Sequence, residues 1–181
     1  MTAPSPQSEW PLRIAADRVA ERPLELEVEA EPAVRAALAT RFDIPSVDAL
    51  HAHVRLSRRR DGDIEVFATL AARVVQLCVV TLEPVAETVD CAVEGRFTGQ
   101  PLEPAESEVL VDPDDDSDTP EPIVDGQIEL GEWLAQQLSL AMNPYPRAPG
   151  AALDAEAAGE GGAAADGPFA KLAQLRRREP D

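Results

Sequence analysis

The sequence predicts an α+β protein: a twisted antiparallel sheet, two main helices and disordered tails. Three observations carry this prediction. Apolar and polar residues alternate strictly along 24–30, and every second residue of 64–74 is apolar, which is typical of strands with one buried face. Successive strand patterns from residue 47 to 97 leave no room for crossover helices, so neighbouring strands should run antiparallel. Such long strands twist strongly and could curl into an open barrel.

The bulk properties favour one folded unit, a single α+β domain over residues 9–146. Of the 181 residues, 44% are hydrophobic but only 4% aromatic, so we expect an aliphatic core. No apolar run approaches the ~20 residues of a membrane-spanning helix. Residues 1–8, which we expect to be disordered, have neither the basic start nor the apolar stretch of a secretory signal. We therefore expect a cytoplasmic protein with no membrane partner.

The first elements follow from local patterns. Trp10–Val19 alternates imperfectly and is predicted to be the first strand. In 24–30 the apolar residues share one side and three glutamates the other, which we interpret as a solvated face that discourages edge pairing. Pro32 suits the first turn of a helix, and Ile44-Pro45 should end that helix. Its apolar stripe consists of Val34, Leu38 and Phe42.

A hairpin follows. Residues 47–60 form one strand, Asp61-Gly62-Asp63 is a strong turn signal, and the return strand is predicted to continue through Cys78 and Val80. Gln76 is the only polar residue on its apolar face. After Glu83-Pro84 a further strand runs to residue 97, with an apolar face of Val85, Val89, Cys91, Val93 and Phe97.

The C-terminal third mixes ordered and disordered predictions. Residues 99–127 form an acidic loop, in which 109–111 could be a short strand. Asp114, Asp116 and Asp118 have the spacing of a calcium loop, but such a site is disfavoured because Thr119 and Asp125 replace its glycine and glutamate. Residues 130–142 form the second helix, ended by Pro144. Residues 147–167 are mostly Ala, Gly, Asp and Glu and are predicted to be a disordered linker. Residues 168–181 are then a short docking segment, for a partner or for the chain's own acidic core, in which Phe169, Leu172 and Leu175 share a helical face.

No motif predicts catalysis, a metal site or a cofactor. His51 and His53 share a strand face without a third ligand nearby, so we expect an ordinary exposed pair, although a hydrolase built on them is a weak third hypothesis. Cys78 and Cys91 fall on adjacent predicted strands, and two structural thiols are favoured over a disulfide. We expect replacement by serine to cost stability, because it buries a hydroxyl, and replacement by alanine to be mild.

The charge distribution indicates which partners the chain can bind. The net charge is −18, and residues 97–146 contain twelve Asp and Glu but no Lys or Arg. Such an acidic surface repels the phosphates of nucleic acid, so we expect no DNA partner. It favours a protein partner, and a basic protein would suit it. Arg58 and Arg59, near the predicted hairpin tip, are the best candidates for direct RNA contact, although pairing with the chain's own carboxylates is favoured.

Three stretches, 73–85, 126–147 and 167–175, together resemble the YceD-like family, whose members are called large ribosomal RNA subunit accumulation proteins. The resemblance covers roughly residues 9–177. It implies a non-enzymatic factor that supports 23S ribosomal RNA accumulation and large ribosomal subunit biogenesis. Some members carry further cysteines suited to a metal site; this chain has no Cys-x-x-Cys, so metal binding is not carried over. The resemblance makes these residues candidates for a shared surface: Arg73, Gln76, Cys78, Thr81, Glu83 and Pro84.

One alternative comes from charge alone. The chain could be an acidic adaptor or chaperone-like module that binds a basic protein client through residues 112–118. Co-purification of a basic protein, with the ratio of large-subunit to small-subunit RNA unchanged, would favour this alternative.

Overall fold

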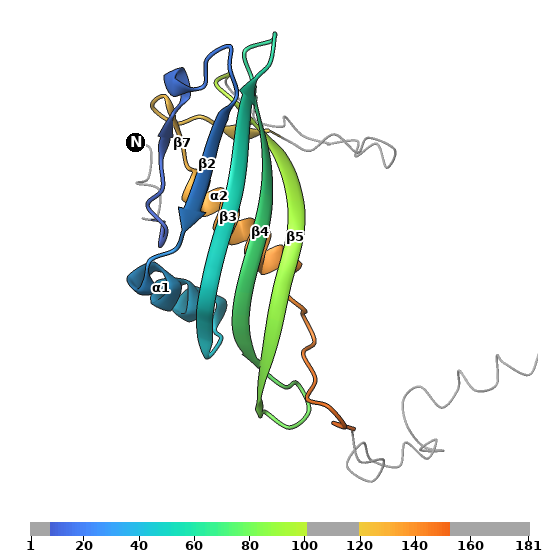
Figure 1. Cartoon of the computed structure of the whole chain (residues 1–181). Helices are drawn as coiled ribbons and strands as arrows, with labels where there is room; N and C mark the ends of the chain where they lie inside the picture. The colour runs from blue at the N-terminus through green and yellow to red at the C-terminus, as the bar shows by residue number, and fades with distance from the viewer. Residues whose placement is uncertain (1–7, 101–119, 153–181) are drawn as a thin grey trace, which may run out of the picture.

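The computed structural model describes residues 8–100 and 120–152. A five-stranded sheet in the order β2-β3-β4-β5-β6 forms the main layer (Figure 1), and a small sheet pairs β1 with β7. The strands are β1 (Ile14–Ala15), β2 (Leu24–Glu29), β3 (Ser46–Arg58), β4 (Ile64–Leu77), β5 (Pro84–Thr98), β6 (Glu121–Pro122) and β7 (Gln127–Ile128). The helices are η1 (Ala16–Arg18, a 3-10 turn), α1 (Pro32–Phe42) and α2 (Leu130–Ala141).

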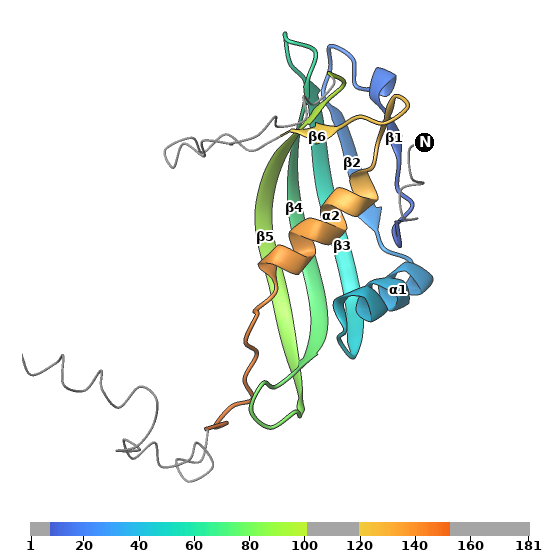
Figure 2. The same cartoon turned by 180° about the vertical axis from the view of Figure 1, so that it is seen from behind.

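The α+β prediction is confirmed, with two refinements. Strands β2 to β5 pair antiparallel as expected, but β6 pairs parallel to β5, so the sheet is mixed. The sheet does not close into a barrel, since within the described residues β2 and β6 each have one neighbour. Helix α2 crosses one face of the sheet, and no described helix covers the opposite face (Figure 2).

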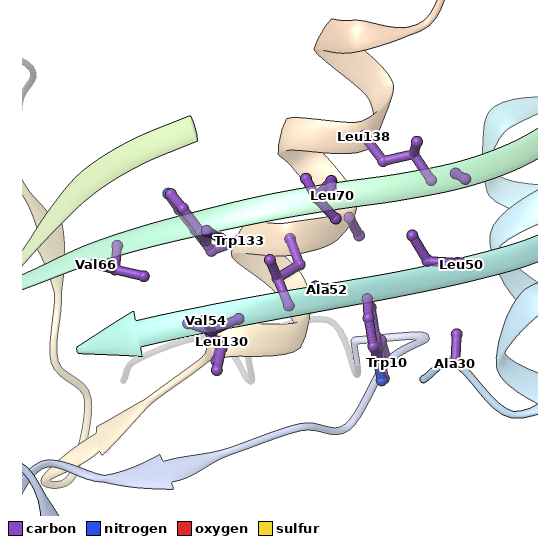
Figure 3. Packing of buried hydrophobic residues seen from close by; sticks show 14 of the residues in the cluster. Trp10, Ala30, Leu50, Ala52, Val54, Val66, Leu70, Leu130, Trp133 and Leu138 are labelled. Atoms are coloured by element: carbon purple, nitrogen blue, oxygen red, sulfur yellow. The ribbon is translucent and has the colours of Figure 1, made fainter. Parts of the chain in front are cut away.

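The core lies between the sheet and α2. Inward residues of β3 and β4 alternate as predicted, and they meet Leu130, Trp133 and Leu138 of the helix (Figure 3). At about 25 cal/mol per Å² of buried apolar surface, this layer is the main stabilising contribution. It is less purely aliphatic than the composition predicts, because Trp10, Phe97 and Trp133 are buried in it. Gln76 is the one polar residue among the buried positions of β4.

The predicted first strand, Trp10–Val19, is wrong in extent. Only Ile14–Ala15 is a strand, and it pairs with β7. Pro11 has no N–H for a ladder, and the Arg58 guanidinium occupies the carbonyls of Ala16 and Val19 that a neighbouring strand would need. The backbone therefore turns into η1 after two paired residues.

The predicted continuation of the return strand through Cys78 and Val80 is also wrong. Strand β4 ends at Leu77, and β5 begins at Pro84. The backbone closes a turn between them, because Cys78 N–H donates to the Glu83 carbonyl at 2.8 Å. This turn lies at the end of the sheet remote from the Asp61-Gly62 hairpin tip (Figure 1).

Candidate functional site at the end of the β4–β5 hairpin

The turn between β4 and β5 holds a leucine in an unusual conformation. Leu82 has φ 60°, in the left-handed region, which costs an L-residue with a branched side chain about 1–2 kcal/mol. Its N–H donates to the Cys78 carbonyl at 2.9 Å, and its side chain is 70% exposed. Asp43 and Asp125 also have positive φ, but Asp tolerates this region far better than Leu. The turn therefore presents an exposed apolar side chain on a strained backbone.

The Cys78 thiol organises the turn from beneath. Its sulfur is buried and accepts hydrogen bonds from the backbone N–H groups of Val80 (3.4 Å), Thr81 (3.4 Å) and Ala148 (3.3 Å). Hydrogen bonding from the Thr81 side chain, followed by that from the Ala148 N–H, lowers the pKa of the thiol to about 6. The sulfur thus joins the turn to a segment 70 residues further along the chain.

The single polar residue on the inner face of β4 anchors the same segment. Gln76 Nε2 donates to Glu87 Oε2 at 2.5 Å and to the Asn143 carbonyl at 3.1 Å. The Asn143 N–H donates in turn to Glu87 Oε1 at 3.1 Å. Because a buried amide without partners would be costly, this network explains why glutamine is stable there. It fixes the chain against the sheet directly after α2.

The segment that follows α2 runs along the turn. The Val79 N–H donates to the Pro146 carbonyl at 2.9 Å, and the Tyr145 N–H donates to Asn143 Oδ1 at 2.9 Å. Pro146 is buried, whereas Tyr145 is exposed. Four exposed apolar residues therefore lie at this end of the molecule, and one of them, Leu77, shares the helix-free face of β4 with Arg73. We call them the apolar end surface: Leu77, Val79, Leu82 and Tyr145.

The structure brings most of the predicted surface residues together. Gln76, Cys78, Thr81, Glu83 and Pro84 all lie at this end; Thr81 Oγ1 is 3.3 Å from Glu83 Oε2, and Pro84 pairs with Leu77 in the ladder. Arg73 is exposed on the opposite face of β4 from Gln76, so it borders the group without joining it.

Arg58 and Arg59 lie at the other end of the 14-residue strand β4, roughly 40 Å away at 3.3 Å per residue. The Arg58 guanidinium donates to the carbonyls of Val19 (2.7 Å), Gly62 (3.0 Å) and Ala16 (2.5 Å). Arg59 pairs with Glu65 and, at 3.3 Å, with Asp61. Both side chains are therefore engaged within the chain. Phe169 and Leu172 lie outside the described residues.

The remaining candidates for metal or thiol chemistry are separate. His51 and His53 are exposed on the helix-free face, where they pair in register with Glu29 and Glu27. Within residues 8–100 and 120–152, no group of three or more His, Cys, Asp or Glu is placed to hold a metal ion. Both cysteines are free, and Cys91 lies opposite Leu70, far from the turn. Burial, and secondarily Asp90, raise the pKa of the Cys91 thiol.

Comparison with known proteins identifies the family of this chain. The family model described as large ribosomal RNA subunit accumulation protein YceD matches residues 66–176, more than half of the sequence. The chain belongs to the YceD family. No curated protein and no solved structure matches it. Among the described helices, none is long and apolar enough to cross a membrane.

The YceD match begins in β4 and includes the whole hairpin end, so it contains the Cys78 turn but not Arg58 or Arg59. Sequence reasoning missed several residues of this site. Pro144 predicts only a helix stop, whereas in the structure Asn143 is bound to Gln76 and Glu87, and the Pro146 carbonyl accepts the Val79 N–H. The signal was the Asn143-Pro-Tyr-Pro146 run itself, since closely spaced prolines favour an extended segment that packs on a neighbour. Nothing in the sequence indicates the left-handed conformation of Leu82.

Proposed function

We propose that this YceD protein is a non-enzymatic, cytoplasmic factor that supports 23S ribosomal RNA accumulation and biogenesis of the large ribosomal subunit. The observation that carries the proposal is the family match over residues 66–176. The matched part contains the end of β4, the turn and the segment after α2, which carry four of the seven exposed large apolar residues of the described molecule.

The proposed contact surface is the hairpin end, with Arg73, Thr81, Glu83 and Pro84 bordering the apolar end surface. Exposed apolar side chains that cluster are typical of interaction sites, whereas scattered ones are not. The strained Leu82 backbone supports this choice, because strain of this kind concentrates at functional positions. Gln76 and Cys78 act as anchors beneath the surface and hold it in shape.

The proposed partner is a protein of the assembling ribosome, and a basic one suits the charge. The chain carries a net charge of −18, which repels a phosphate backbone. Arg58 and Arg59, the basic residues best suited to RNA, would have to exchange their internal partners for phosphates. This exchange offers little gain, so we place the interaction at the opposite end.

Two measurements in cells test the proposal. Depleting the protein should lower the ratio of large-subunit to small-subunit ribosomal RNA. Tyr145→Ala should lower it as well, because Tyr145 is 72% exposed and belongs to the surface, whereas Leu140→Ala on α2, where Leu140 is 79% exposed, should leave the ratio unchanged. An unchanged ratio after depletion would overturn the proposal, and a basic protein co-purifying under that condition would favour the adaptor alternative.

A further inference from the structure

The apolar end surface stands on a hydrogen-bonded backbone, and its four side chains are exposed within the described residues. Leu77, Val79, Leu82 and Tyr145 are 45%, 46%, 70% and 72% exposed. Hydrogen bonds from Leu82 N–H to the Cys78 carbonyl and from Val79 N–H to the Pro146 carbonyl bring together the backbone segments that carry Val79, Leu82 and Tyr145, and Leu77 ends β4 beside them. A soluble protein rarely leaves such a cluster open to water without an occupant.

The chain itself supplies an occupant within reach. The described chain ends at residue 152, four residues after Ala148, whose N–H binds the Cys78 sulfur. Figures 1 and 2 show the segment after α2 running to the β4–β5 turn. Residues 153–167 separate this point from Pro168; a fully extended chain of that length spans at most about 50 Å, and a flexible one averages roughly 20 Å.

The tail has the chemistry that the surface needs. Phe169, Leu172 and Leu175 recur at a spacing of three residues, which places them on one side of a helical turn. Residues 168–181 contain four basic and two acidic residues, whereas the whole chain has a net charge of −18. Glu83 is exposed directly beside Leu82 and offers the basic tail one carboxylate there, whereas the exposed Arg147 lies beside Tyr145.

We propose that residues 168–178 dock onto the apolar end surface of their own chain, with Phe169 and Leu172 against Leu82 and Tyr145. Attachment through a short linker gives the tail an effective concentration on the order of 1 mM, so even a weak contact is largely formed. A ribosomal partner that uses the same surface then competes with the tail. The docking itself does not depend on the proposed function.

A single-site probe tests the docking in the full chain. Tyr145 is the only tyrosine, so 3-fluorotyrosine labels one position and gives one ¹⁹F resonance. A soluble paramagnetic chelate broadens this resonance according to its exposure. We expect at least about twofold greater broadening in the Phe169→Ser/Leu172→Ser variant than in the wild type, because the tail no longer covers the ring.

Leu82→Gly provides the reciprocal test. Glycine adopts the left-handed conformation without strain, so the fold should be retained while the docking surface loses its most protruding leucine. We expect increased broadening here too, and no change in the control Leu140→Ala.

Equal broadening in the wild type and the tail variant would overturn the proposal. Protection lost on dilution would indicate a second copy, and protection appearing only with added ribosomal proteins would indicate a partner; either result would overturn it. Ribosomal RNA ratios are not involved, so this failure is separable from that of the proposed function.

Discussion

At the scale of single residues, the neighbours of Cys78 change the effect that we expect from its replacement. The sequence places it on an apolar strand face, where alanine would be a mild replacement. In the structure its sulfur accepts three backbone N–H groups, and alanine would leave all three without an acceptor. Serine retains an acceptor atom. We therefore expect Cys78→Ala to be more destabilising than Cys78→Ser, the reverse of the order that the sequence alone predicts.

The lowered pKa of Cys78 predicts a pH-dependent stability. The thiol titrates near 6 in the folded protein and near 9.0 as a free group, so below pH 6 both states are protonated and the linkage contributes nothing. Between pH 6 and 9 the folded state alone has released its proton, so the free energy of unfolding should rise with pH. Urea unfolding of wild type and Cys78→Ser should show a stability difference that widens over this range. A difference independent of pH would contradict the prediction.

At the scale of elements, one guanidinium joins both helices and the N-terminal segment. Arg41 of α1 binds Glu132 of α2 through both nitrogens, at 2.6 and 2.7 Å, and Glu9 at 2.8 Å. The hydrogen bond from Arg41 lowers the pKa of the Glu132 carboxyl to about 2. The paired side chains are about one third exposed or less, so the pair is better placed than an ordinary surface ion pair.

The Arg41–Glu132 ion pair predicts how the stability of the fold decreases at low pH. The Glu132 carboxyl has a folded pKa below its usual 4.5, so its contribution is complete above pH 4.5 and is lost as the pH falls toward 2. Glu132→Gln should cost about 1 kcal/mol near neutral pH, as expected for a bidentate pair after solvent screening. The deficit should shrink on acidification in chemical unfolding experiments. Glu129→Gln, which removes the more exposed pair with Arg13, should have little effect; an equal effect would refute the special role of Arg41.

Close packing of α2 on the N-terminal segment predicts that a side chain at residue 131 destabilises the fold. A Cβ on Gly131 would lie 2.0 Å from the Trp10 carbonyl oxygen, which is backbone and cannot rotate away. Gly131→Ala should therefore cost about 1–3 kcal/mol, as overpacking does elsewhere. Gly99→Ala is the matched control, because nothing lies within 4 Å of its added Cβ. Urea unfolding of both variants measures the difference, and equal stability would show that the segment can shift freely.

The period and spacing of apolar residues predicted most helices and strands, but not the contacts that join them. The alternation in β2 and β4, the Asp61-Gly62 turn and both helices were predictable, because each depends on one apolar face. The two-residue strands β1, β6 and β7 have no such face and depend on contacts between distant segments. For the same reason the turn residues Gln76, Cys78 and Glu83 could be named as candidates, whereas their link to Asn143 and Ala148 could not.

At the scale of the whole molecule, each end of the sheet holds a distant segment of the chain. Arg58 ties the N-terminal segment to one end of the sheet, through the Ala16 and Val19 carbonyls. Gln76 and Cys78 tie the segment after α2 to the other end. Because the YceD match begins inside β4, it includes the Cys78 end and omits Arg58 and the Asp61-Gly62 hairpin tip. The exposed residues of the Cys78 end are consequently where we expect substitutions to affect ribosomal RNA without affecting folding.

The last prediction concerns where the folded unit stops. Residues 153–167 consist almost wholly of Ala, Gly, Asp and Glu, so removing them should leave the thermal midpoint almost unchanged. Starting the deletion at Ala148 should behave differently. It would join Arg147 to Pro168, which has no N–H to donate to the Cys78 sulfur. Losing that bond, typically about 1 kcal/mol, lowers the midpoint by roughly 2–4 °C in a protein of this size. Calorimetry of the two deletions would decide the boundary: equal midpoints would show that Ala148 contributes nothing to the fold, and a drop of several degrees in the shorter deletion would show that the linker packs on the core.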